Sequence, residues 1–230
     1  MVYQLHIFLE GSQPLVWRRV RMPAEDATFA DLAMVCLGAM GWDNSHLHEF
    51  YDLNDEDASR IGMILEDGDD DFLEDEEEVL LTERFNLEGQ TFGMIYDMGD
   101  SWEHHITLEE INDDDNLAAP KLLGGANACP PEDVGGIPGY YLMVEALEDP
   151  DHESHQDMLD WLGFEEGETW DITEFDAEEA QELILTYWED EEEILDGFME
   201  ELENYDYDDD DFDDDEDEDD EVEDDFEEEW

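Results

Sequence analysis

Residues 126–140 read ANACPPEDVGGIPGY, and no other stretch of the chain places so many conformationally special residues so close together. The adjacent prolines Pro130 and Pro131 fix φ and remove two backbone donors. The glycine pairs at 124–125 and 135–136 permit positive φ or close backbone approach. We therefore expect an ordered, irregular loop, and call residues 126–140 the central loop.

Three side chains of the central loop could carry chemistry. Cys129 supplies a sulfur, while Glu132 and Asp133 supply carboxylates. In an ordered loop these atoms point in fixed directions, as a binding or catalytic site requires. A loop that only turns the chain accounts for the same residues equally well.

Upstream of the central loop, the pattern predicts strands and one helix. Residues 2–9 alternate with period two, and residues 15–22 follow a Gly-Ser-Gln-Pro turn, which predicts an antiparallel hairpin. Thr28 is a suitable N-cap, and the apolar stripe behind it predicts a helix over residues 28–40. Further strands are expected at 46–53, 61–65, 91–96 and 101–111.

Downstream of the central loop, the pattern changes to helices. Apolar periodicity predicts helices near 139–147 and 154–163, with Trp161 and Leu162 in the core. A final helix is expected from Asp176 to about residue 202. The sequence thus predicts an α+β domain over residues 1–203, in which helices pack on an antiparallel sheet.

The last segment, residues 204–230, is predicted to be a disordered acidic tail. Twenty of its 27 residues are acidic and none is basic. Ordering a backbone costs about 1–2 kcal/mol per residue, and burial of an apolar side chain returns about 1.5–3 kcal/mol. The tail has only six apolar side chains, so burial cannot offset the entropy lost on ordering.

The charge of the chain restricts its partners. There are 77 acidic and six basic residues, a formal net charge of −71, and every basic residue lies within the first 121. We therefore expect no direct binding to nucleic acid and none to anionic membranes, because phosphate contacts rely on Lys and Arg. Arg18 and Arg19 are expected to pair with the surplus carboxylates, in preference to binding a ligand.

The location of the protein also follows from composition. No apolar run approaches 18 residues and no charged-then-apolar leader begins the sequence, so we expect a cytoplasmic protein with free thiols. A high-salt cytoplasm is a competing explanation of the acidity, since salt screens the repulsion between carboxylates.

Histidines and the central loop together suggest a metal site. His46 and His48 would share one face of a strand, His104 lies on another strand, and Cys129 lies in the central loop. Imidazole, thiolate and carboxylate suit zinc or another transition metal, and Glu132 and Asp133 of the central loop supply the carboxylates. The competing interpretation is that these histidines are packed and hydrogen-bonded without a metal.

Four blocks of sequence resemble the plasmid pRiA4b ORF-3-like family. They are Trp17-Arg18-Arg19, GWDNSHLHEF at 41–50, YDMGDSWEH at 96–104 and the central loop. Members of this family are also labelled as TnpR-like passengers of an insertion element, which implies an association with mobile elements. A recombinase would need more cations than this chain has, and the family is largely uncharacterised.

The resemblance marks candidate site residues. The following match the family blocks or lie in the central loop, and we take them as candidates for a ligand pocket: Trp42, His46, His48, Asp97, Asp100, Trp102, His104, Cys129, Glu132 and Asp133.

Three functions are compatible with the sequence. The favoured one is a non-enzymatic binding or interaction module with its ligand pocket at these residues. The second is a metal-dependent hydrolase that uses a His/Cys/carboxylate site. The third is an acidic protein that competes for nucleic-acid-binding surfaces, with the tail binding a basic protein partner.

Overall fold

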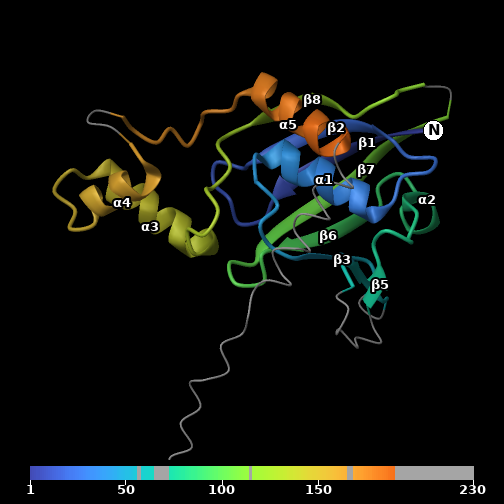
Figure 1. Cartoon of the computed structure of the whole chain (residues 1–230), viewed down its shortest axis with the longest axis horizontal. Helices are drawn as coiled ribbons and strands as arrows, with labels where there is room; N and C mark the ends of the chain where they lie inside the picture. Colours follow the sequence, from blue (N-terminus) through green and yellow to red (C-terminus); the bar gives the residue numbers. More distant parts are fainter. Residues whose placement is uncertain (56–57, 65–72, 114–115, 165–167, 190–230) are drawn as a thin grey trace, which may run out of the picture.

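Eight strands form one sheet in the computed structural model, which describes residues 1–55, 58–64, 73–113, 116–164 and 168–189 (Figure 1). The strands are β1 (Val2–Leu9), β2 (Trp17–Pro23), β3 (His48–Asp52), β4 (Arg60–Gly62), β5 (Leu73–Asp75), β6 (Thr91–Tyr96), β7 (Trp102–Asn112) and β8 (Lys121–Ala126). The helices are α1 (Phe29–Met40), α2 (Leu81–Arg84), α3 (Gly136–Glu148), α4 (His155–Leu162) and α5 (Ala177–Glu189). The predicted α+β class is confirmed.

The sheet has the order β5-β4-β3-β6-β7-β1-β2-β8. The predicted hairpin is present, because β1 pairs antiparallel with β2, and β7 pairs antiparallel with the other edge of β1. Leu5, Ile7 and Leu9 are fully buried, as the period-two alternation predicts. The sheet is antiparallel, as expected, except for the β4–β5 pair at its edge, which is parallel.

Helix α1 lies between the sheet and α5 (Figure 1). Thr28 caps it, because the hydroxyl accepts from the Asp31 amide at 3.3 Å while the Asp31 carboxylate accepts from the Thr28 amide at 2.8 Å. Gly38 allows α5 to approach, since an added Cβ would lie 2.9 Å from the Ile184 Cα. The helix predicted over residues 28–40 is confirmed.

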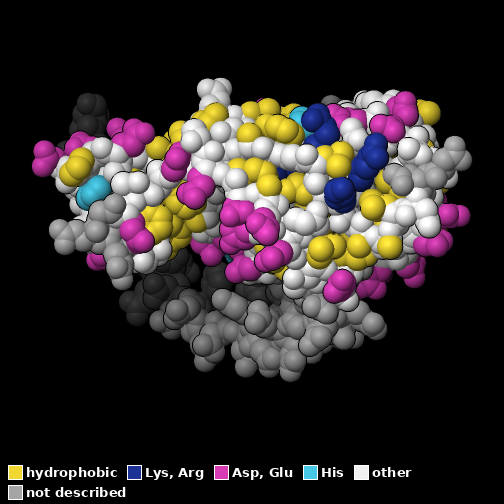
Figure 2. Space-filling view, turned by 90° about the horizontal axis from the view of Figure 1, so that it is seen from above, with side chains coloured by type: hydrophobic (Ala, Val, Ile, Leu, Met, Phe, Trp, Pro, Cys, Tyr) yellow, Lys and Arg dark blue, Asp and Glu magenta, His cyan; other side chains and the backbone are white. Residues whose placement is uncertain are grey.

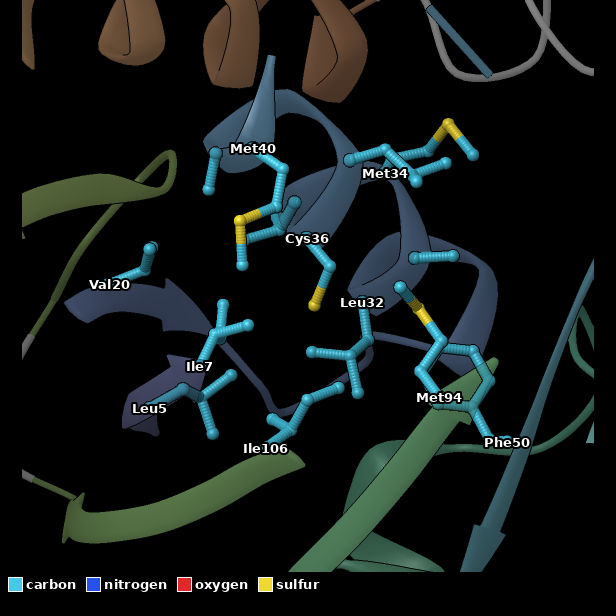
Figure 3. Packing of buried hydrophobic residues seen from close by; sticks show 14 of the residues in the cluster. Leu5, Ile7, Val20, Leu32, Met34, Cys36, Met40, Phe50, Met94 and Ile106 are labelled. Atoms are coloured by element: carbon cyan, nitrogen blue, oxygen red, sulfur yellow. The ribbon is translucent and has the colours of Figure 1, made fainter. Parts of the chain in front are cut away.

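The core fills the space between α1 and the sheet. Figure 3 shows Leu5, Ile7 and Ile106 of the sheet below Leu32 and Cys36 of α1. All five side chains have no solvent exposure. Each stabilises the fold by about 1.5–3 kcal/mol if its burial follows the transfer scale for large apolar side chains.

Helices α3 and α4 lie beyond the end of the sheet (Figure 1). α3 buries Tyr140 and Met143, whereas α4 has no fully buried residue. The prediction that Trp161 lies in the core is wrong, because its side chain is 47% exposed. Leu162, its neighbour, is partly buried against the core.

Periodicity missed three short elements, β5, α2 and β8. The glycines Gly124 and Gly125 interrupt the apolar pattern of β8, yet this strand pairs with β2. α5 begins after Asp176, whose carboxylate accepts two backbone N–H groups at 2.8 and 3.1 Å. The predicted continuation of this helix to residue 202 and the predicted tail, 204–230, lie outside the described residues. No helix in the described part of the chain is long and apolar enough to cross a membrane.

The arginines of β2 divide between two environments. Arg19 donates to both carboxylate oxygens of Glu109 at 2.7 and 2.8 Å, as predicted. Arg21 forms an ion pair with Glu110. For Arg18 the prediction is wrong: the side chain is 2% exposed and lies over the Phe175 ring. It donates to the carbonyls of Trp17, Ala39, Ala126 and Asn127. Burial lowers the pKa of Arg18 to about 10, and the nearby Cys129 raises it in part.

Candidate functional site

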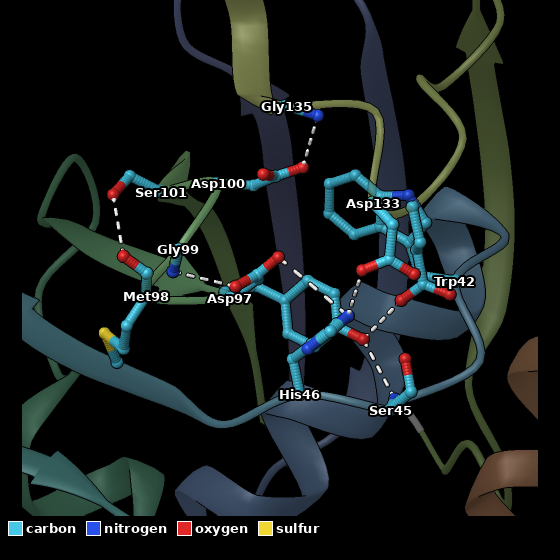
Figure 4. Close-up of polar contacts among 12 residues, drawn as sticks. Trp42, Ser45, His46, Asp97, Met98, Gly99, Asp100, Ser101, Asp133 and Gly135 are labelled. Carbon is cyan, nitrogen blue, oxygen red and sulfur yellow. Dashed lines mark hydrogen bonds and ion pairs between the residues drawn. The ribbon is translucent and has the colours of Figure 1, made fainter. Parts of the chain in front are cut away.

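Three segments far apart in the sequence meet at one end of the sheet (Figure 4). They are the approach to β3, which carries His46, the β6–β7 turn at 97–101, and the central loop. His46 Nε2 lies 3.1 Å from Asp133 Oδ1 and 3.9 Å from Asp97 Oδ2. One imidazole and two carboxylates therefore converge, and we call them the His46 group.

The two aspartates of the His46 group are held by unusual backbone conformations. Asp97 has φ +56° and Asp133 has φ +60°, both in the left-handed region. Asp97 Oδ1 accepts from the Gly99 amide at 2.8 Å, so the turn fixes one oxygen and leaves Oδ2 directed at His46. Residues in sparsely populated backbone regions often lie at functional sites.

The β6–β7 turn also fastens the central loop. Asp100 Oδ2 accepts from the Gly135 amide at 3.0 Å (Figure 4). Gly136 has φ +65°, and an added Cβ would collide with the Asp100 carbonyl oxygen. Gly136 of the central loop is thus required for the close approach of this loop to the Asp100 backbone.

A buried stack of aromatic rings contacts both His46 and the central loop. Trp42 stacks on Tyr96 with ring centroids 5.2 Å apart, and it also contacts Trp102 and His104. Trp42 Nε1 donates to the Pro130 carbonyl at 2.8 Å, which connects the stack to the central loop. Trp42, Trp102 and His104 are at most 2% exposed. These three candidates therefore position the loop and do not line an open pocket.

Glu132 joins the aromatic stack to the His46 group. Tyr96 donates its hydroxyl to Glu132 Oε1, and the Asp43 amide donates to Oε2 at 3.2 Å. The Tyr96 ring packs edge-on against the His46 ring, with centroids 5.7 Å apart. Burial, followed by a hydrogen bond to the Asp43 side chain, raises the pKa of Glu132 to about 7, although the Tyr96 hydrogen bond lowers it in part. Glu132 is thus suited to exchange a proton near neutral pH.

The donor set of the His46 group fits a divalent cation. Its three ligand atoms lie within 4.8 Å of one another, and no other such group of three occurs in the described residues. His46 Nε2 is shielded from solvent and, within the described chain, makes no hydrogen bond of acceptable geometry. Nitrogen and carboxylate oxygen are ligands for zinc and manganese.

The predicted metal ligands His46, His48, His104 and Cys129 do not form one group; this is a correction to the predicted geometry. β3 begins at His48, so His46 lies before the strand and is oriented independently of it. His48 turns inward, where Nε2 lies 2.8 Å from Glu76 Oε2 and both side chains are 1% exposed. The physical reason is that the strand alternation fixes His48 but not a residue two positions upstream of it.

His104 and Cys129 lie in environments that favour their neutral forms. Burial lowers the pKa of His104 to about 4, although a hydrogen bond with the Met94 carbonyl raises it in part. Burial raises the pKa of Cys129 to about 12, although the nearby Arg18 lowers it in part. A thiol with this pKa is protonated at neutral pH, so Cys129 is poorly suited to act as a nucleophile.

Comparison with known proteins identifies the family. The model of the family described as "Plasmid pRiA4b ORF-3-like protein" matches residues 1–179. This chain belongs to the plasmid pRiA4b ORF-3-like family. The resemblance inferred from the four blocks is confirmed, and the match extends through α3 and α4. The label of insertion-element passenger stays a prediction.

Two proteins that are similar to this pRiA4b ORF-3-like chain carry names that assign no function. The "Uncharacterized protein y4hQ" of Sinorhizobium fredii (strain NBRC 101917 / NGR234) is 38% identical over 162 residues, covering 70% of this chain and 81% of the relative. A crystal structure is known of a "Protein of Unknown Function MM3350 from Methanosarcina mazei Go1". It is 34% identical, with a TM-score of 0.64, and the match covers 76% of this chain and 95% of that one.

Sequence reasoning missed several residues of this pRiA4b ORF-3-like site. Tyr96 lies in a predicted strand and in the family-like block at 96–104 but is not among the candidates, although its hydroxyl accepts from the Ser45 amide at 3.0 Å and donates to Glu132. Asp43 lies in the family-like block at 41–50 but is not among the candidates for the ligand pocket. Glu76, the partner of His48, lies among acidic residues between the strands predicted at 61–65 and 91–96, where nothing in the sequence distinguishes it from neighbouring carboxylates.

Proposed function

We propose that this chain is a binding module whose site is a divalent cation held by His46, Asp97 and Asp133. The observation that supports the proposal is the convergence of three donor atoms from three separate segments. Without a cation, the two carboxylates repel one another, and no Lys or Arg belongs to the group to offset their charge.

The separations of the donor atoms fit a zinc ion. Ligands about 2.0–2.2 Å from a tetrahedral zinc lie about 3.4 Å from each other. The distances of 3.1 and 3.9 Å from His46 Nε2 to the two aspartates bracket this value. Small side-chain movements would therefore complete the coordination.

The site is open on the side of Asp133. The Asp133 side chain is 68% exposed, whereas that of Asp97 is 12% exposed. Three protein ligands leave a coordination position for water or for a ligand. An oxygen donor such as a carboxylate or phosphate group is the ligand class that this position suits, because it would bind the cation directly.

A metal-dependent hydrolase is the second candidate, and Glu132 is the observation that favours it. A carboxylate that lies close to a bound cation can accept a proton from water. Glu132 precedes Asp133 in the chain and contacts the group through Tyr96. The bound cation would supply electrophilic assistance, and Glu132 would hold the proton on a carboxylate oxygen.

The first experiment measures cation binding by the purified full chain. Zinc and manganese are titrated by calorimetry at high salt, which weakens unspecific binding to surface carboxylates. We expect one specific site per chain, lost in His46→Asn and in Asp133→Asn. His105→Asn and Asp151→Asn are the matched controls, since they change a histidine and an exposed aspartate outside the group. Equal stoichiometry in all five proteins would refute the proposal.

The second experiment separates the module from the hydrolase. Glu132→Gln retains the ligands of the His46 group but cannot take up a proton. A binding module keeps its affinity for the cation and for an anionic ligand in this variant. A hydrolase keeps the cation but loses turnover of phosphate or carboxylic esters by more than about a hundredfold.

The remaining sequence predictions stay predictions. The acidic tail, with its suggested basic protein partner and its competition for nucleic-acid-binding surfaces, lies outside the described residues. The absence of direct nucleic-acid binding, a cytoplasmic location and an association with mobile elements rest on composition and on the resemblance alone.

A further inference from the structure

Helices α3 and α4 leave apolar side chains uncovered. Leu142 of α3 is 66% exposed and Trp161 of α4 is 47% exposed. Scattered single apolar residues on a surface are ordinary, but these two line the same groove. Met143 and Met158 also belong to its lining.

The groove is large enough to take apolar side chains of a partner. Its volume is about 410 Å³, within the range of about 300–1,000 Å³ typical of ligand sites. Methionine is flexible and polarizable, so the partly exposed Met158 can adapt to side chains of different shape, whereas Met143 is buried in the core. Asp133 belongs to both the groove lining and the His46 group, and it places a carboxylate in the lining.

The surroundings of the groove carry one sign of charge. Residues 136–162, which contain both helices, hold seven carboxylates and no Lys or Arg. All seven of these acidic residues are exposed. In Figure 2, hydrophobic surface at the end of the molecule formed by α3 and α4 lies among acidic side chains, and the visible basic side chains lie on the other half.

We propose that the groove between α3 and α4 binds a basic amphipathic segment of another protein. Apolar side chains of the segment would enter between Leu142 and Trp161, and its Lys or Arg residues would pair with the surrounding carboxylates. A second copy of this chain or its own residues 204–230 would bring more negative charge to an already negative surface. Charge complementarity therefore selects a basic partner.

This proposal does not depend on the cation site. Of the residues that line the groove, only Asp133 also belongs to the His46 group. Loss of cation binding in His46→Asn would leave the groove intact, so the two proposals fail separately.

The probe is a short synthetic helix-forming peptide of Leu and Lys, with leucines at helical spacing. Its binding to the full chain is followed by NMR of methionine methyl groups. We expect the methyl signals of Met143 and Met158 to shift on titration, whereas that of Met98, which is 49% exposed in the β6–β7 turn, stays in place. Signals that do not move while the peptide binds would assign binding elsewhere and overturn the proposal.

Matched variants test the apolar part. Leu142→Ser combined with Trp161→Ser should weaken the peptide about tenfold or more, since each 1.4 kcal/mol of lost burial is tenfold in affinity. Leu87→Ser is the control, because Leu87 is 67% exposed and outside the groove. Equal affinity in the double variant and the control would show that the groove takes no part.

Matched changes of charge test the basic part. Asp157→Asn with Asp160→Asn should weaken binding without disturbing the groove, because both side chains are exposed on α4. A peptide in which Glu replaces Lys should not bind. Equal binding of the Lys and Glu peptides would overturn the choice of a basic partner. A peptide in which Ser replaces Leu, if it bound as tightly as the amphipathic one, would overturn the apolar anchor.

Discussion

His46 and His48 stand two residues apart, yet the open site and the interior use them in different ways. His46 lies before β3 and faces two carboxylates, one of them exposed to solvent. His48 begins β3 and meets Glu76 where both side chains are 1% exposed. The first arrangement leaves room for a ligand, whereas the second excludes water and other partners.

The difference teaches that accessibility, more than residue type, decides what an imidazole–carboxylate contact can do. A buried pair loses the solvation of both groups and depends on the partner for compensation. A half-exposed group keeps part of its hydration and can exchange partners, including a cation. We therefore expect mutation to reduce stability more at His48 than at His46, and added metal to stabilise the protein only through the His46 group.

The largest effect is expected for the interior pair. His48→Ala leaves the Glu76 carboxyl buried without its partner, and breaking such a pair costs about 3–5 kcal/mol. Urea denaturation of both proteins measures the free energy of unfolding. His46→Ala, the matched change in the open site, should cost less than about 1 kcal/mol.

A double variant sharpens this result. His48→Leu with Glu76→Leu removes both polar groups, so most of the stability lost in His48→Ala should return. Similar losses for His46→Ala and His48→Ala would contradict the distinction between the two environments.

The next effect concerns the backbone that closes the open site. Gly136→Ala places a Cβ against the Asp100 carbonyl at φ +65° and should cost about 2–3 kcal/mol, the upper part of the range for local backbone strain. Gly163→Ala is the control, because Gly163 has φ +69° but no atom within 4 Å of an added Cβ. It should cost about 1 kcal/mol, the penalty of the left-handed region alone. Thermal unfolding of both variants measures the difference, and equal losses would exclude a steric role for Asp100.

A smaller effect is expected in the pH dependence of stability. The pKa of Glu132 is raised to about 7 from an ordinary value of 4.5, so the folded state binds more protons than the unfolded state between these values. Glu132 therefore lowers the free energy of unfolding as pH rises from about 4.5 to 7, and the contribution is constant above that window.

Comparison with Glu132→Gln isolates this contribution. The stability difference between wild type and Glu132→Gln should change across the window, in favour of the variant at the higher pH. The exposed Glu145→Gln serves as the control and should show no such change relative to wild type. A pH-independent difference for Glu132→Gln would contradict the raised pKa.

The smallest change in intrinsic stability is expected for Asp133→Asn. The side chain is 68% exposed, so its replacement should alter the free energy of unfolding by less than about 0.5 kcal/mol. Added zinc should separate the proteins, because a cation at a hundred times its dissociation constant stabilises wild type by about 2.7 kcal/mol. Calorimetric melting with and without zinc measures both effects. Equal zinc stabilisation of wild type and Asp133→Asn would contradict the distinction between the open site at His46 and the buried pair of His48 and Glu76.

Much of the fold could be predicted from local pattern. The hairpin of β1 and β2, the capped helix α1 and the start of α5 all follow from periodicity and capping residues within a few positions. β8 and β5 could not be predicted in this way, because they are short and depend on pairing with another strand. Trp161 shows a related limit, since apolar spacing marks one face of a helix but does not show whether another element covers it.

The candidate site was predicted in part. His46, Asp97, Asp133, Asp100 and Glu132 were selected, and the structure brings them to one end of the sheet. His46 was predicted to group with His48 and His104, because the strand was expected to begin at residue 46. β3 begins at His48 instead, so the strand alternation does not orient His46.

The sequence by itself determined the overall acidity, the family, the order of most elements and the loop whose glycines must approach another backbone. These properties depend on composition, on the four family-like blocks or on neighbours within a few residues. Only the tertiary structure decided that His46 meets Asp97 and Asp133 while His48 meets Glu76. The physical reason is that one carboxylate resembles another in a chain with 77 of them, and only the packed sheet and loops select which come within bonding distance.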